Sequence, residues 1–194
     1  MQRFRGMKID EMLEAIDNIE KRIGFNLSNV QKILLTTDGS VTRILEVLTK
    51  KPVVIETKVK TIIKADEDLA KALKIESGED VNFRVVHLKN PDDRALVFAR
   101  SWTPMKGLSN SIKRDLTSVD IPIGKILIKH KIETRREIMS IDAINADDEM
   151  VKAFDVKLGD LMLSRYYNII HEARILIRIN EVFPTSTTNF LHLM

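Results

Sequence analysis

The sequence predicts an α+β fold in which helices surround an antiparallel sheet and the chain contains an internal pseudo-symmetric repeat. The segment 65–84 is similar to the segment 146–165, and each copy continues through an apolar hairpin to a proline, Pro104 or Pro184. Stretches with helical periodicity are interspersed with stretches that alternate like strands. Two such units are too few for a solenoid, which needs about three, but they can pair around one sheet.

The repeat is visible in the letters themselves. ADEDLAKALKIESGEDVNFR aligns with ADDEMVKAFDVKLGDLMLSR, and most of the pairs that differ are similar in character. Each copy predicts one helix, a glycine turn and two antiparallel strands. The identical pairs are Ala65/Ala146, Asp66/Asp147, Lys71/Lys152, Ala72/Ala153, Gly78/Gly159 and Arg84/Arg165.

The segment before the first copy predicts helices followed by a strand. Residues 7–23 place apolar side chains on one helical stripe, and 27–36 predicts a second, shorter helix. Asp38-Gly39-Ser40 supplies turn and N-cap residues for a third helix that ends before Pro52. Residues 53–65 then alternate like a strand. The stripe of 7–23 consists of Ile9, Met12, Leu13, Ile16 and Ile19.

The segment between the two copies predicts one helix and one strand. Pro122 and Gly124 precede an apolar-periodic stretch at 126–132, which predicts a helix. Residues 133–144 predict a strand. No linker interrupts this pattern, so we expect a single domain over residues 1–194.

The hairpin 83–104, FRVVHLKNPDDRALVFARSWTP, carries an arginine in each arm. Its two apolar runs flank turn-forming residues at 89–93. If these five residues form the loop, Arg84 pairs with Phe98. Arg84 then lies diagonal to Arg100 on one face of the hairpin, where both could contact one small ligand.

A carboxylate lies on an apolar strand face near the C-terminus. In ARILIRINEVFP, alternation puts Glu181 on the same face as Ile177, Ile179 and Phe183. A lone buried charge costs several kcal/mol, so such a residue is normally paired or faces a cavity. One interpretation is a structural Arg–Glu ion pair that closes the sheet. The other is a pocket in which two arginines and Glu181 bind an anion and transfer protons.

The sequence contains four short motifs, FRVVHL, ALVFARSWTP, IPIGKILIKHKIETRREI and ILIRINEVFP. In this order and separation they resemble the chorismate pyruvate-lyase (4-hydroxybenzoate synthase) family, and especially its archaeal and actinobacterial branch. The resemblance runs from about residue 34 to 184 and implies a chorismate lyase-like fold with an enclosed cavity. The implied reaction eliminates pyruvate from chorismate and leaves 4-hydroxybenzoate, without metal or organic cofactor.

The resemblance also implies roles for individual residues. Arg84 would bind the ring carboxylate, and Arg100 would lie near the enolpyruvyl group and assist catalysis. Glu181 would contact the 4-hydroxyl region and serve proton transfer. Ile123 would contact the ligand through its backbone amide, and Val41 would cover the pocket from the lid side.

Arg165 repeats the position of Arg84 and is either a second pocket cation or a surface residue at a strand end; we expect the latter. A different class of function also stays open. The same fold serves as the effector-sensing domain of GntR-type repressors, so a non-catalytic module that binds small carboxylates is the alternative. The stretch before residue 60 contains the lyase-like LLTTDGSVT and leaves no room for a winged helix, which disfavours a DNA-binding repressor.

Composition narrows the class of protein. Hydrophobic content of 44% and charged content of 30% argue against disorder. The net charge of +3 is too small by itself to indicate nucleic acid but would suit small anionic ligands. The resemblance implies that the ligand is a small anionic aromatic or cyclic carboxylate. The absence of cysteine excludes disulfides, thiolate catalysis and cysteine-ligated metals, and the four histidines lack metal-ligand spacing. Without a signal core or a long apolar run, we expect a cytoplasmic protein that binds no membrane.

Overall fold

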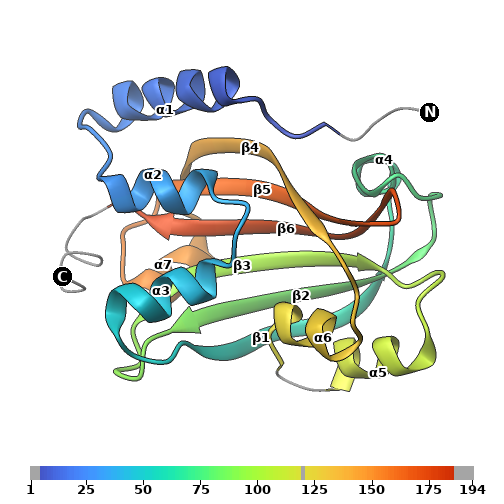
Figure 1. The fold of residues 1–194 in the computed structure, drawn as a ribbon. Coiled ribbons are helices and arrows are strands. Elements are labelled where there is room, and N and C mark those ends of the chain that lie inside the picture. Colours follow the sequence, from blue (N-terminus) through green and yellow to red (C-terminus); the bar gives the residue numbers. More distant parts are fainter. Residues whose placement is uncertain (1–4, 119–120, 186–194) are drawn as a thin grey trace.

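The computed structural model describes residues 5–118 and 121–185, which form six strands and seven helices. The strands make one antiparallel sheet in the order β1-β2-β3-β6-β5-β4 (Figure 1). The α+β class expected from the sequence is therefore confirmed. The strands are β1 (Val54–Lys64), β2 (Asp80–Lys89), β3 (Ala95–Pro104), β4 (Arg135–Asn145), β5 (Leu161–His171) and β6 (Arg174–Pro184). The helices are α1 (Ile9–Ile23), α2 (Asn29–Thr36), α3 (Val41–Thr49), α4 (Glu67–Leu73), α5 (Asn110–Ser118), α6 (Ile123–Lys129) and α7 (Asp148–Phe154).

The predicted repeat appears as two halves with the same element order. The unit β1-α4-β2-β3 is followed by β4-α7-β5-β6, and the halves join between β3 and β6 at the centre of the sheet. Asp66 and Asp147 cap the two repeat helices through side-chain oxygens. Gly78 and Gly159 adopt φ values of 84° and 83°, in the left-handed region that suits glycine.

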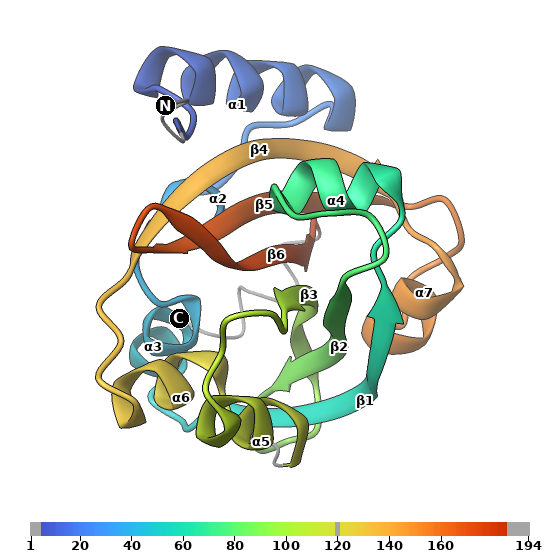
Figure 2. The same ribbon diagram turned by 90° about the vertical axis from the view of Figure 1, so that its right-hand side faces the viewer.

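Strand alternation divides the sheet into two faces, each covered by different helices (Figure 2). We call the face that bears Leu88, Leu163 and Ile179 the site face; it packs against α2, α3 and α6 in the largest core cluster. The opposite face packs against the repeat helices α4 and α7 through two smaller clusters. The repeat helices therefore stabilise the sheet from behind and leave the site face to the other helices.

The predicted helices and strands between the repeats are also found, with small shifts. The helix expected at 126–132 is α6, and the strand expected at 133–144 is β4. In α1, Ile16 and Ile19 are buried, whereas Ile9 and Leu13 at the start of the same stripe are exposed. The sequence predicts no helix at α5, whose segment NSIKRDLTS contains only two apolar residues, Ile112 and Leu116.

The β2–β3 hairpin has a different register from the expected one. Arg84 lies opposite Ser101, not Phe98, and a bulge occurs between Leu88 and Lys89. Arg100 lies opposite Val85, on the face that packs against the repeat helices. A shift by an odd number of residues reverses the facing of a whole arm, so the two arginines point to opposite faces.

Candidate functional site

The site face of the sheet contains a cavity of about 530 Å³. Side chains of β2, β3, β5 and β6 form its floor, and the first turns of α3 and α6 cover it. This volume lies in the range of small-molecule sites, about 300–1,000 Å³. Of the predicted site residues, Val41, Arg84, Ile123 and Glu181 line the cavity.

Arg84 forms one end of the cavity floor and is only 4% exposed. Its Nη2 donates to Thr57 Oγ1 at 2.9 Å, and its Nη1 donates to the carbonyl oxygen of Ile121 at 2.9 Å. The first contact ties the guanidinium to β1, and the second ties it to the segment just before α6. The cross-strand neighbour of Arg84 is Ser101, which also lines the cavity.

Glu181 lies in a buried cluster with Arg165 and Tyr167. Arg165 Nε donates to Glu181 Oε2 at 2.8 Å, and Nη2 lies 2.8 Å from the same oxygen. The Tyr167 hydroxyl donates to Glu181 Oε1 at 3.1 Å. Burial raises the pKa of the Tyr167 phenol, and the neighbouring Glu181 raises it further. Tyr167 therefore stays protonated and keeps donating to Glu181.

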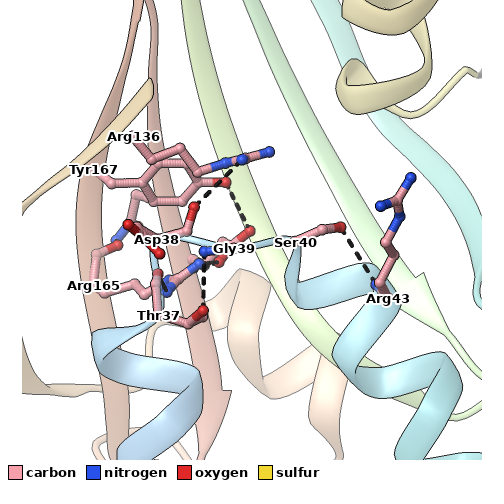
Figure 3. Close-up of polar contacts among 10 residues, drawn as sticks. Thr37, Asp38, Gly39, Ser40, Arg43, Arg136, Arg165 and Tyr167 are labelled. Atoms are coloured by element: carbon pink, nitrogen blue, oxygen red, sulfur yellow. Dashed lines mark hydrogen bonds and ion pairs between the residues drawn. The ribbon is translucent and has the colours of Figure 1, made fainter. Parts of the chain in front are cut away.

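Arg165 also fixes the loop that leads into α3. Its Nη1 donates to the carbonyl oxygen of Thr37 at 2.8 Å, and the Gly39 amide donates to Thr37 Oγ1 at 2.9 Å (Figure 3). The expectation that Arg165 is a surface residue is wrong, because its side chain is fully buried. The internal repeat could have indicated this burial, because it aligns Arg165 with Arg84, which is also buried.

Arg100 lies away from the cavity, and the prediction that it shares a face with Arg84 is wrong. Its Nη2 forms ion pairs with Asp147 Oδ2 at 2.8 Å and Glu149 Oε2 at 2.6 Å. Both carboxylates belong to the N-terminal end of α7, on the opposite face of the sheet. The guanidinium also stacks over the Phe98 ring. Arg100 thus holds a repeat helix against the sheet.

Val41 and Ile123 lie where the covering helices begin. Val41 is the first residue of α3 after the cap Ser40, and Ile123 is the first residue of α6 after Pro122. Proline and serine are common at helix starts because the first amides have no partner within the helix. Val41, the predicted lid-side residue, and Ile123, the predicted backbone contact, both line the cavity.

The cavity carries more cationic than anionic side chains among the described residues. Two residues that the sequence did not single out, Tyr167 and Arg136, also line it. Tyr167 could have been identified because alternation places it on the same face as Arg165. The cations are Arg43, Arg84, Lys125 and Arg136, and the carboxylates are Glu46 and Glu181.

Within residues 5–118 and 121–185, no group of histidine and carboxylate side chains is arranged so that it could hold a metal ion. No helix in this part of the chain is both long and apolar enough to cross a bilayer.

Several solved structures with this fold come from transcriptional regulators. The effector domain of PhnF from Mycobacterium smegmatis superimposes with a TM-score of 0.63 at 14% identity, covering 77% of this chain and 91% of that one. A GntR-family regulator from Bacillus cereus gives 0.55 at 16% identity, covering 68% and 90%. At these identities the likeness establishes the chorismate lyase-like fold alone.

Two sequence comparisons identify the family. A curated relative from Methanocaldococcus jannaschii, named "Putative lyase MJ0807", is 41% identical over 164 residues, which cover 82% of this chain and 80% of the relative. Residues 35–191 match the family described as "Chorismate pyruvate-lyase Rv2949c-like". The protein therefore belongs to the Rv2949c-like chorismate pyruvate-lyase family.

Proposed function

We propose that the protein is a carbon–oxygen lyase that eliminates pyruvate from chorismate, or from a closely related cyclic carboxylate, and leaves 4-hydroxybenzoate. The observation that carries this proposal is the cavity on the site face. It has the volume of a small-molecule site, an excess of cations, and Arg84 and Glu181 together on its floor. Family membership and the relative named as a lyase support the same reaction class.

The reaction breaks the bond between the ring and the enolpyruvyl oxygen and removes the proton at the hydroxyl-bearing ring carbon. The electron pair of the C–H bond completes the aromatic ring, and the departing enolpyruvate takes up a proton to become pyruvate. Aromatisation supplies most of the driving force. The protein has to bind a dianion, exclude water and position the groups that transfer the proton.

Arg84 and Glu181 have separate roles in this proposal. Arg84 binds the ring carboxylate, since its guanidinium is fixed from two sides and its planar fork suits a carboxylate. Glu181 accepts hydrogen bonds from Arg165 and Tyr167, but a carboxylate has about four acceptor positions. It can therefore also accept from the substrate 4-hydroxyl and serve proton transfer. Val41 and Ile123 enclose the ring from the helix side.

The test is to incubate the purified protein with chorismate and measure pyruvate and 4-hydroxybenzoate in equal amounts. Arg84→Gln should reduce kcat/KM by about 100-fold or more, because it removes a charged contact to the substrate. Arg94→Gln is the matched control, since this exposed arginine belongs to the same hairpin. Wild-type turnover by Arg84→Gln would contradict the assignment.

A second function, a non-catalytic sensor of a small carboxylate, is favoured by one observation. The solved structures with this fold include the effector domain of a regulator. A sensor binds 4-hydroxybenzoate or chorismate without releasing pyruvate, so calorimetry with both compounds, combined with the pyruvate assay, separates the two functions.

A further inference from the structure

Arg136 lies at the opposite end of the site face from Arg84. Arg84 belongs to β2, and Arg136 belongs to the edge strand β4, with β3, β6 and β5 between them. The sheet is curled, so that its two edges turn toward each other (Figure 2). Both arginines line the cavity. Arg136 pairs with Ile169, and both residues line the cavity.

Strand alternation directs Arg136 toward the cavity and its neighbour Arg135 away from it. Arg135 lies on the other side of β4, and its Nε donates to Glu137 Oε1 at 2.9 Å. Arg136 instead lies beside Tyr167 (Figure 3). Its positive charge partly offsets the rise in the pKa of the Tyr167 phenol that burial and Glu181 cause. Arg135 thus points away from the cavity and pairs with Glu137, whereas Arg136 points into the cavity.

Arg136 has no carboxylate partner within residues 5–118 and 121–185. Its one hydrogen bond in this range, from Nη1 to the carbonyl oxygen of Asp38, is long at 3.4 Å. The Glu181 carboxylate is bound by Arg165 and Tyr167. Glu46, the other carboxylate of the cavity, accepts from the Val53 amide at 3.2 Å. The described part of the chain therefore leaves the Arg136 charge to be balanced by a ligand or by solvent.

We infer that Arg136 binds a second carboxylate of the ligand and makes the cavity selective for dicarboxylates over monocarboxylates. This inference rests on the proposed function, in which Arg84 binds the first carboxylate. A substrate that carries both a ring carboxylate and an enolpyruvyl carboxylate presents two anions to the two ends of the cavity. Arg136 takes the place near the enolpyruvyl group that the family resemblance implies for Arg100. The product retains only one carboxylate, so it loses this contact and is released more easily.

The test uses two stable ligands that differ by one carboxylate, 3-(carboxymethoxy)benzoate and 3-methoxybenzoate. Calorimetry measures both with the wild type, Arg136→Gln and Arg135→Gln. Arg136→Gln should weaken the dicarboxylate by about tenfold to about a hundredfold, because a charge-assisted contact is lost, and the monocarboxylate by less than about threefold. Arg135→Gln should change neither. Arg136→Lys, which keeps the charge without the planar fork, should recover part of the affinity.

Several outcomes would overturn the inference. These are an equal loss for both ligands in Arg136→Gln, no loss for either, an equal loss in Arg135→Gln, or failure of the wild type to prefer the dicarboxylate. Thermal melting of each variant shows whether a loss reflects unfolding. If the selectivity depends on Arg136 but the wild type releases no pyruvate from chorismate, the lyase proposal fails while the dicarboxylate site stands.

Discussion

Arg84 and Arg165 occupy equivalent positions in the two halves of the molecule, but their cross-strand neighbours differ. Arg165 lies opposite Glu181 and forms an ion pair with it, and Arg84 lies opposite Ser101. Both arginines are buried on the site face. In one half the cross-strand neighbour of the arginine is a carboxylate, and in the other half it is a small hydroxyl residue that lines the cavity.

The comparison suggests how one repeated unit yields both a structural and a binding element. The Arg165–Glu181 pair stabilises the loop before α3 through Thr37 and fixes one wall of the cavity. Ser101 leaves space on the floor beside Arg84, where we propose that the ligand carboxylate binds. The two interpretations that the sequence left open, an ion pair and an anion site, then belong to different halves.

The largest expected effect comes from breaking the ion pair in the C-terminal half. Glu181→Gln should lower the free energy of unfolding by about 3–5 kcal/mol, because Arg165 stays buried without its counter-charge. Urea denaturation measures this. The double variant Arg165→Met with Glu181→Leu should recover most of the loss, since an apolar pair of similar volume replaces the charges. Glu181→Gln with the stability of the wild type would show that the pair contributes nothing.

The next effect comes from making the N-terminal half resemble the C-terminal one. Ser101→Glu puts a carboxylate opposite Arg84, where it should occupy the anion site and weaken 4-hydroxybenzoate binding by at least about tenfold. Ser101→Gln has the same size without the charge and should retain more affinity. Calorimetry on both folded variants makes the comparison, and equal affinities would count against an anion site beside Ser101.

A smaller effect is expected for Tyr167→Phe. The change removes the donor to Glu181 Oε1, and the free energy of unfolding should fall by about 1.5–3 kcal/mol. The raised pKa of Tyr167 sets the pH dependence. The folded state holds the phenol proton more tightly than the unfolded state, so the contribution is complete below the ordinary pKa of 10.0 and is lost as pH rises above it. Denaturation at pH 7 and pH 11 should show a smaller difference at the higher pH; a difference independent of pH would contradict this.

The repeat made much of the fold predictable. Identical residues such as Asp66/Asp147 and Gly78/Gly159 mark helix caps and turns, and these local features do not depend on the rest of the molecule. Alternation in β6 likewise placed Glu181 on a buried face, because the strand keeps a period of two from Ile177 to Phe183. Helix caps, turns and strand alternation depend on residues that are close in the sequence, so the sequence alone can predict them.

The partners of the charged side chains were less predictable, because they depend on hairpin register. The β5–β6 turn is Glu172-Ala173, with both residues at positive φ, and this pair lacks the glycine or asparagine that usually marks such a turn. The sequence therefore gave no signal that Arg165 lies opposite Glu181. In β2–β3 the bulge at Leu88/Lys89 shifted the register and moved Arg100 to the far face.

The smallest expected effect tests that far face directly. Arg100→Gln removes ion pairs to Asp147 and Glu149, whose side chains are 46% and 52% exposed. Partly exposed pairs of this kind contribute about 1 kcal/mol or less, so unfolding should change little. Pyruvate release from chorismate and 4-hydroxybenzoate binding should equal those of the wild type, because the guanidinium lies across the sheet from the cavity. A loss of turnover without a loss of stability would return Arg100 to the site and would mean that the hairpin register differs when substrate is bound.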